Sequence, residues 1–269
     1  MRLRSARARL LVAFTVFSAI TGKASAHDFW IEPGTFRPAV GSQLAVSLRV
    51  GQDFHGDPVP RNPRLITRFS LISSSSETPI AGFDGVDPAG IARVTEPGLF
   101  WIAYRSGRTA VTLDADKFEK YLGEEGLERI IGIRRERGEA DRPGREVFSR
   151  SAKALVIAGD GGAQGFDRVL GLTLELVLLK DPRRRSPKQP VAVELLYEGK
   201  PLEGSLLTAM EQTHPEQKIR VRTDRKGQAL LPLGQTGVFL IKAVQMIPAP
   251  ADAEADWESI WASLTFEIP

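Results

Sequence analysis

Cysteine is absent from the 269 residues, and histidine and methionine occur only three times each. Without a thiol, the chain has no disulfide, no thiolate metal site and no cysteine for a lipid anchor. The Gly-x-Ser-x-Gly turn of hydrolases, the phosphate-binding loop and the His-Glu-x-x-His metal motif are also missing. These absences exclude the enzyme classes that a short motif reveals, and they direct attention to the histidines.

Long apolar runs are missing too, because the clearest one, residues 10–21, is too short to span a bilayer. Four isolated arginines precede it, and Ala24-Ser25-Ala26 supplies the small residues that signal peptidase requires. This pattern predicts a cleavable secretory signal over residues 1–26. We therefore expect a soluble periplasmic protein whose mature chain begins at His27.

The basic character of the chain depends on that segment. It carries five of the 36 basic residues and no acidic residue, which leaves 31 basic against 33 acidic residues. The sequence pI near 9.2 is therefore that of the precursor, in which the predicted signal segment adds basic residues only. It gives no support to a nucleic-acid partner.

Short runs of alternating apolar and polar residues, separated by Gly and Pro, predict a mainly β fold. Residues 114–150 differ, because Phe118, Tyr121 and Leu122 follow Asp114 and Asp116 at helical spacing. The charged stretch 134–150 is typical of a solvated helical face or connector. We predict two tandem Ig-like or transthyretin-like β-sandwiches over residues 27–113 and 165–269, joined by a helical connector and loop over 114–164. The strands that we expect cover residues 43–50, 65–72, 99–104, 172–179, 191–197, 206–210, 219–222, 238–244 and 262–268.

The second half of the chain repeats the first. Asp87-x-x-Gly90-x-Ala92 leads to Gly98-Leu-Phe-x-Ile102, and Asp224-x-x-Gly227-x-Ala229 leads to Gly237-Val-Phe-x-Ile241. The order and spacing of turn residues and strands agree, which predicts the same strand order in both sandwiches. The segment from Gly199 to Gly204 also resembles part of a carboxypeptidase-regulatory-like sandwich.

Cleavage before His27 makes a histidine the first residue. Its α-amine and its imidazole Nδ1 can chelate one metal ion, and a further imidazole completes a histidine brace suited to copper or nickel. His55 and His214 are the only other imidazoles, and Glu32, Asp28 and Met246 are weaker candidate ligands. The alternative is that His27 is an ordinary first residue that hydrogen-bonds to the sheet.

The segment from Ala26 to Pro33 (AHDFWIEP) resembles the start of a bacterial periplasmic family, domain-of-unknown-function family 4198. The resemblance extends through residues 104–106, 117–127, 134–139, 149–154, 199–202, 242–244 and 256–264, and so covers essentially the whole predicted mature chain. It implies an association with nickel or cobalt uptake systems.

Three functions remain open at this stage. We favour a non-enzymatic periplasmic protein that binds a divalent transition metal ion (Ni, Co or Cu) or its chelate. Its partner would be a metal-uptake transporter or outer-membrane receptor. The alternatives are a histidine-brace copper oxidase acting on polysaccharide, and a structural or adhesion sandwich without a ligand. Tryptophans exposed beside His27 would favour the oxidase, and buried tryptophans the binding protein.

Overall fold

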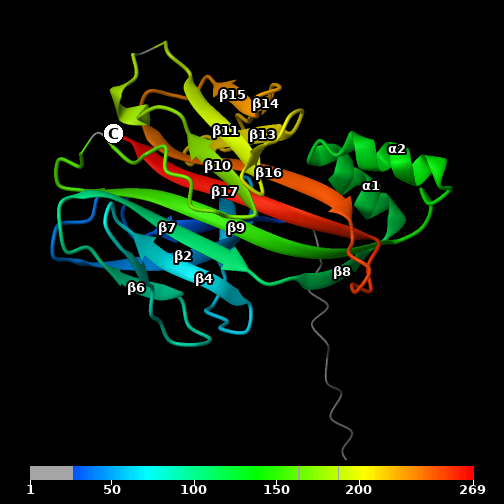
Figure 1. Cartoon of the computed structure of the whole chain (residues 1–269), viewed down its shortest axis with the longest axis horizontal. Coiled ribbons are helices and arrows are strands. Elements are labelled where there is room, and N and C mark those ends of the chain that lie inside the picture. Colours follow the sequence, from blue (N-terminus) through cyan, green and yellow to red (C-terminus); the bar gives the residue numbers. More distant parts are fainter. Residues whose placement is uncertain (1–26, 163, 187) are drawn as a thin grey trace, which may run out of the picture.

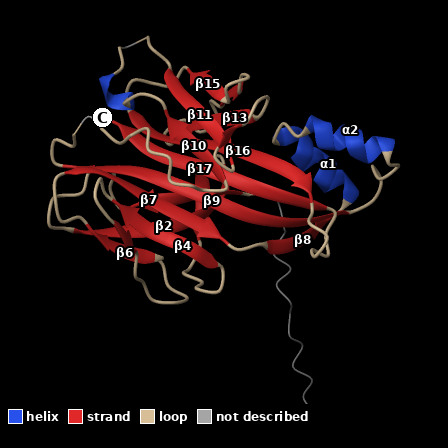
Figure 2. Cartoon of the chain, viewed as in Figure 1, coloured by secondary structure: helices blue, strands red, loops and turns tan. Residues whose placement is uncertain are grey.

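The computed structural model describes residues 27–162, 164–186 and 188–269, so the predicted signal segment lies outside the described residues. Strands are by far the most abundant regular element in this part of the chain, which confirms the prediction of a mainly β fold (Figure 2). Within these ranges, no helix has the length and apolar character needed to cross a membrane.

Two small sheets and one large sheet form the body of the molecule (Figure 1). The first small sheet contains β1 (Asp28–Pro33), β2 (Gln43–Gln52), β3 (His55–Pro58) and β6 (Gly90–Arg93). The second contains β10 (Leu174–Leu178), β11 (Val191–Tyr197), β12 (Lys200–Pro201) and β15 (Gln228–Leu231). A 3-10 helix, η1 (Pro182–Arg184), lies between β10 and β11.

The large sheet runs through both halves of the chain. Its order is β14 (Ile219–Arg222), β13 (Leu206–Glu211), β16 (Gly237–Pro248), β17 (Trp257–Ile268), β9 (Gly144–Ala158), β7 (Gly98–Ser106), β4 (Ile66–Ile72) and β5 (Glu77–Pro79), and β8 (Thr109–Leu113) also pairs with β9.

The two central strands of this sheet, β9 and β17, are parallel neighbours, with Glu146 opposite Trp257 and Ala154 opposite Thr265. Parallel strands can be exchanged by a two-fold axis that runs along them, and such an axis also exchanges the two faces of the sheet. The small sheets accordingly cover opposite faces, one below and one above the large sheet in Figure 1. Alternate residues of one strand therefore enter different cores. Phe100 and Ile102 lie in the first core, whereas Trp101 and Ala103 lie in the second.

The strand order of the two halves agrees, as the internal repeat predicts. β2 pairs with β1, β3 and β6, and β11 pairs in the same way with β10, β12 and β15. β7 lies between β4 and β9, and β16 lies between β13 and β17. Asp87 and Asp224 occupy equivalent turns immediately before β6 and β15.

The segment between the two copies contains α1 (Ala115–Glu124) and α2 (Glu128–Glu136), which pack on one end of the large sheet. Asp114 is the N-cap residue of α1, and Phe118, Tyr121 and Leu122 form its buried side, as the spacing predicts. The prediction of a connector over 114–164 needs correction at its second part. There β9 forms a central strand, because its residues 152–158 are continuously apolar except for Lys153.

A second correction concerns the charged stretch 134–150. Arg134 is not solvated but only 1% exposed. Its guanidinium donates to Glu119 and to the backbone carbonyls of Glu139 and Arg142, and it lies over the ring of Phe118. Arg134 thereby holds the end of α2 against α1 and the turn that leads into β9.

Candidate functional site

The beginning of β1 lies beside the tip of the β2–β3 hairpin. Asp28 of β1 is opposite Gly51 of β2, so the residue before it, His27, falls beside Gln52. On the other side of β2, Gln52 pairs with His55 of β3. Residues directly opposite one another in antiparallel strands project from the same face. Extended by one residue, this register aligns His27 with Gln52 and His55 in one row across three strands, with two strand spacings, about 10 Å, between the outer Cα atoms. We call it the histidine row.

The histidine row continues the inner face of the first small sheet. Phe29, two residues after His27, is buried in the first core, and so is Leu48, which lies four residues before Gln52. Because side chains alternate along a strand, residues two or four apart share a face. His27 is half-buried, whereas Gln52 and His55 are exposed, so the row lies at the open end of the first sandwich.

The hairpin tip is fixed by an unusual turn. Asp53 and Phe54 have φ angles of 53° and 58°, the left-handed conformation that a two-residue hairpin turn requires at both central positions. Neither residue is glycine, so each conformation costs about 1 kcal/mol or more. Burial of Phe54 offsets this cost, because its ring meets Trp30 edge to face at 5.4 Å and packs on Met210 and Leu240.

The same tip contacts the second copy. Lys218, in the loop between β13 and β14, forms an ion pair with Asp53. His214 belongs to that loop, where its Nδ1 lies 3.1 Å from the Thr213 hydroxyl. The structure thus brings the loop that carries His214 onto the hairpin that carries His55.

The two other candidate ligands lie elsewhere. Glu32 is five residues along β1 from His27, which is roughly 16 Å at 3.3 Å per residue, and it pairs with Arg49. Met246 is 1% exposed and packs among the aromatic residues beneath the helices. Among the described residues, no three His, Asp or Glu side chains are grouped closely enough to hold a metal ion by themselves.

Asp28 connects the start of β1 to β16 and α1. The Lys242 ammonium donates to Asp28 at 2.5 Å and to Glu125 at 2.6 Å, and all three side chains are almost buried. Burial alone would lower the pKa of Lys242, but the two carboxylates outweigh it and raise that pKa. Burial also raises the pKa of Glu125. When all three are ionised, the group carries a net charge of −1 next to His27, which suits a nearby cation.

Arg150 lies below the first small sheet, on the face of β9 that β1 covers. Its guanidinium carbon is 4.7 Å from the ring centroid of Phe29 and 5.2 Å from that of Phe148. Burial lowers the pKa of Arg150. No sequence motif points to this residue. The signal that it offers is a charged side chain inside a long strand.

A second buried acid lies under the helices. Glu146 is 3% exposed and accepts hydrogen bonds from the hydroxyls of Tyr121 and Ser259. Burial raises the pKa of Glu146 to about 7, although both hydroxyls act in the opposite direction. Trp261 donates to Ser259 at 3.0 Å and stacks on Tyr121. This group lies on the same face of the large sheet as Lys242 and Arg150.

All four tryptophans are buried. Trp30, Trp101 and Trp257 are at most 2% exposed, and Trp261 is 8% exposed. The structure therefore offers no tryptophan platform beside the histidine row on which a sugar ring could stack.

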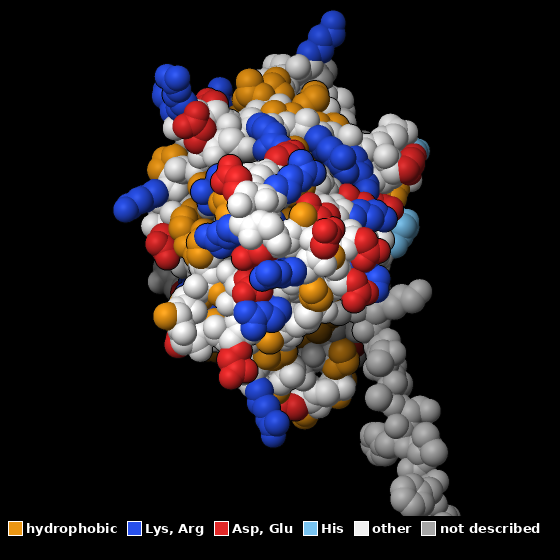
Figure 3. Space-filling view, turned by 90° about the vertical axis from the view of Figure 1, so that its right-hand side faces the viewer, with side chains coloured by type: hydrophobic (Ala, Val, Ile, Leu, Met, Phe, Trp, Pro, Cys, Tyr) orange, Lys and Arg blue, Asp and Glu red, His pale blue; other side chains and the backbone are white. Residues whose placement is uncertain are grey.

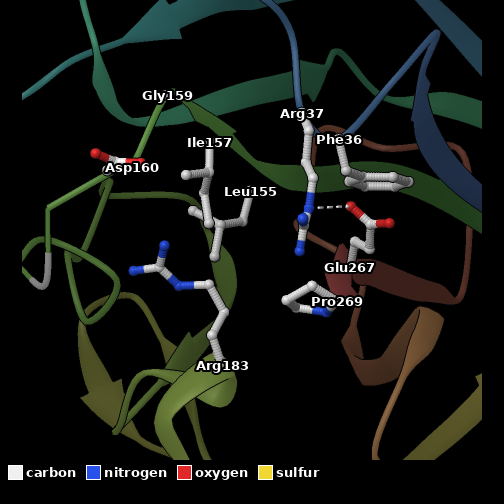
Figure 4. Close-up of a pocket in the computed structure, with 9 residues that line it drawn as sticks. All are labelled: Phe36, Arg37, Leu155, Ile157, Gly159, Asp160, Arg183, Glu267 and Pro269. Carbon is white, nitrogen blue, oxygen red and sulfur yellow. Dashed lines mark ion pairs between the residues drawn. The ribbon is translucent and has the colours of Figure 1, made fainter.

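Two hollows away from the row have different properties. One, of about 220 Å³, lies at the junction of the halves and contains Arg37 and Arg183 (Figure 4). Arg37 pairs with Glu267, and Arg183 is held by Asp181 and two backbone carbonyls, so both charges are already satisfied. The other hollow lies at the open end of the second sandwich, where Tyr197 and Ile260 contribute to its wall, and it contains no histidine.

The surface over the helices has no area of a single charge. Figure 3 shows acidic and basic side chains interspersed on this face, with histidine side chains at one edge of the view. An extended electrostatic docking surface is therefore not present on this face.

The sequence matches the model of a family described as Domain of unknown function (DUF4198) over residues 24–247. No curated protein matches it. Among solved structures, it is similar to the D0-D1 domain of intimin, with 13% identity over 89% of this chain and 97% of that chain. The TM-score of 0.21 is too low to carry any conclusion about this protein.

Proposed function

The chain belongs to the domain-of-unknown-function family DUF4198, and we propose that it is a non-enzymatic periplasmic protein that binds a divalent transition metal ion or its chelate. His27, as the first residue of the processed chain, provides an α-amine and an imidazole, and His55 provides a second imidazole. The observation that supports the proposal is the strand pairing behind the histidine row, which sets the start of β1 beside the β2–β3 hairpin that carries His55.

The donor set fits such an ion. An amine and two imidazoles are the nitrogen ligands that Ni²⁺, Co²⁺ and Cu²⁺ prefer, at about 2.0–2.1 Å from the metal. Asp28, the next residue in the chain after His27, forms a group with Lys242 and Glu125 that is net negative when all three are ionised, and this charge favours a cation in the vicinity. His214 is the reserve ligand, on the loop that Lys218 ties to the hairpin.

Burial of the tryptophans argues against the alternative of a polysaccharide oxidase. Such an enzyme needs a flat face with aromatic residues around the metal, and the tryptophans nearest the row instead fill the core. A binding protein needs only the ligands and an open edge from which to exchange its ion. We propose a metal-uptake transporter or an outer-membrane receptor as the partner that receives it.

The test is a titration of the secreted, processed protein with Ni²⁺, Co²⁺ and Cu²⁺. One added alanine before His27 keeps every side chain but destroys the amine–imidazole chelate. We expect this extension to weaken binding at least tenfold more, about 1.4 kcal/mol, than His55→Ala or His214→Ala alone. Gln52→Ala is the matched control, because it changes the same row without removing an imidazole. Equal affinity with and without the added alanine would refute the role of His27.

A further inference from the structure

A hollow of about 670 Å³ lies at the open end of the second sandwich, between the large sheet and the second small sheet. Sites of this size hold small organic ligands. The large sheet contributes Arg105, at the end of β7, and Ile260 of β17, whereas Tyr197 and Glu198 come from the end of β11 and the turn after it. Two sheets of a sandwich are about 10 Å apart, so the hollow has two facing walls at about that separation.

The hairpin turn of the second copy leaves this end open. Both hairpins have a two-residue turn, formed by Asp53 and Phe54 in the first copy and by Glu198 and Gly199 in the second. The Phe54 ring is buried and meets Trp30 edge to face. Gly199 stands in the place of Phe54 and has no side chain, so the turn of the second copy does not close the hollow beside it.

Arg105 is the cation in the wall that has donors available for a ligand. Its Nε donates to the Thr67 hydroxyl at 3.2 Å, and within the described ranges its two terminal nitrogens have no acceptor. Arg108, in the same wall, differs because it donates to Glu258 through two nitrogens, at 2.8 and 3.0 Å. A guanidinium presents its donors in a planar fork that matches the two oxygens of a carboxylate.

Glu198 is the available carboxylate in the facing wall. It has the same place in its turn as Asp53, which pairs with Lys218, but Glu198 itself has no ion pair in the described part of the chain. Burial raises the pKa of Tyr197, and the charges of Glu198 and Glu258 raise that pKa further. Negative charge is therefore present beside Tyr197, across the hollow from the free end of the Arg105 side chain.

We propose that this hollow binds a short peptide with free termini, whose carboxylate lies on the Arg105 fork and whose ammonium lies at Glu198. This site is separate from the histidine row and goes beyond the proposed metal function. Two arginines and two glutamates line the hollow, so their charges balance. A ligand that carries one charge of each sign is therefore attracted at both ends, whereas a ligand of a single charge is attracted at one end and repelled at the other.

The separation of the walls sets the length of the peptide. An extended chain spans at most roughly 3.3–3.6 Å per residue, so about three residues bridge walls that are about 10 Å apart. Ile247 and Ile260 offer an apolar surface to a side chain between the two ends. The hydroxyls of Tyr197 and Ser149 can donate to peptide carbonyls or accept from peptide N–H groups.

Calorimetric titration of the secreted, metal-free protein with trialanine tests this inference. N-acetyl-trialanine lacks the ammonium and trialanine amide lacks the carboxylate, so we expect each to bind about tenfold more weakly than trialanine. Arg105→Met should weaken trialanine and N-acetyl-trialanine by about tenfold but leave trialanine amide unchanged. Glu198→Gln should weaken trialanine and trialanine amide to a similar extent but leave N-acetyl-trialanine unchanged.

Two matched variants outside the hollow serve as controls. Arg220→Met removes an exposed charge from β14, and Glu194→Gln removes one from the outer face of β11, so neither should change the affinity for any of the peptides. Thermal unfolding of each variant shows that it is folded. If trialanine fails to bind, or if both hollow variants bind it as tightly as the wild type does, the inference is wrong. The affinity for Ni²⁺ should be the same in all four variants, because no histidine lines the hollow.

Discussion

Replacement of Glu146 by glutamine should stabilise the protein at alkaline pH and have little effect at acidic pH. The carboxyl of Glu146 is 3% exposed, and its pKa in the folded protein is raised by burial to about 7 from an ordinary value of 4.5. Between those two pH values the unfolded chain has lost the proton that the folded chain still binds, so stability falls as pH rises. Above the folded pKa the loss is complete.

The size of the effect follows from the two pKa values. The difference corresponds to about 3 kcal/mol of unfolding free energy lost between pH 4.5 and pH 7. Glutamine has the shape of the protonated acid and carries a donor where that acid carries its proton, so it keeps the hydroxyl partners Tyr121 and Ser259. We therefore expect Glu146→Gln to be within about 1 kcal/mol of the wild type at pH 5 and about 2–3 kcal/mol more stable at pH 8.5.

Urea unfolding followed by tryptophan fluorescence at several pH values measures this difference. Subtracting the wild-type curve from the variant curve removes the contributions of all other titrating groups. Glu258→Gln is the control, since Glu258 is on the same strand as Ser259 but faces the other side and pairs with Arg108. It should gain no stability at pH 8.5. A difference between Glu146→Gln and wild type that stays flat from pH 5 to 8.5 would refute the assignment of a buried, proton-bearing carboxyl.

Two further predictions concern the core and the N-terminus. The pair of Lys153 and Glu175 is 1% exposed on both sides, so Lys153→Met alone should cost about 3–5 kcal/mol in urea unfolding by leaving the carboxylate uncompensated. The double variant Lys153→Met, Glu175→Gln should recover part of that loss, and a double variant less stable than either single one would contradict this reasoning. Intact mass of the secreted protein should correspond to a chain that begins at His27. A start at Lys23 or earlier would remove the terminal chelate and with it the proposed metal site.

The sequence was sufficient for nine of the strands and for the agreement in strand order between the two copies, but it did not reveal the others, β9 among them. In β2, Leu44, Val46 and Leu48 alternate with less buried residues, and alternation is a local signal. The repeat predicted equivalent turns at Asp87 and Asp224, because turn residues are fixed by local backbone geometry. The parallel pairing of β9 with β17 had no such signal. Their paired residues are more than a hundred positions apart, and nothing in either strand identifies the other.

The charged residues of the site show the same limit. Lys242 donates to Asp28, 214 positions away, and to Glu125, 117 positions away, so the partners of this lysine follow only from the fold. What the sequence offers is the anomaly of a charge within an apolar strand, as for Lys242 in β16. Such a residue is a reason to expect a partner or a ligand, but its sequence context does not say which of the two.

The comparison of the two copies separates scaffold from site. Leu44 pairs with Ala92 as Val193 pairs with Ala229, which aligns β2 with β11. Counted from Leu44, the hairpin turn of the first copy begins nine residues later, at Asp53. Counted from Val193, the hairpin turn of the second copy begins only five residues later, at Glu198. The extra residues of the first hairpin include Gln52, Phe54 and His55.

The candidate ligands therefore lie where the copies differ. Both copies share the turns, the strand order and the buried apolar residues that each sandwich needs for stability. A longer hairpin adds nothing to such a core, and the second sandwich is complete without it. The cost of the longer hairpin to the first copy, in two left-handed residues at its tip, is what a binding function at the histidine row would explain.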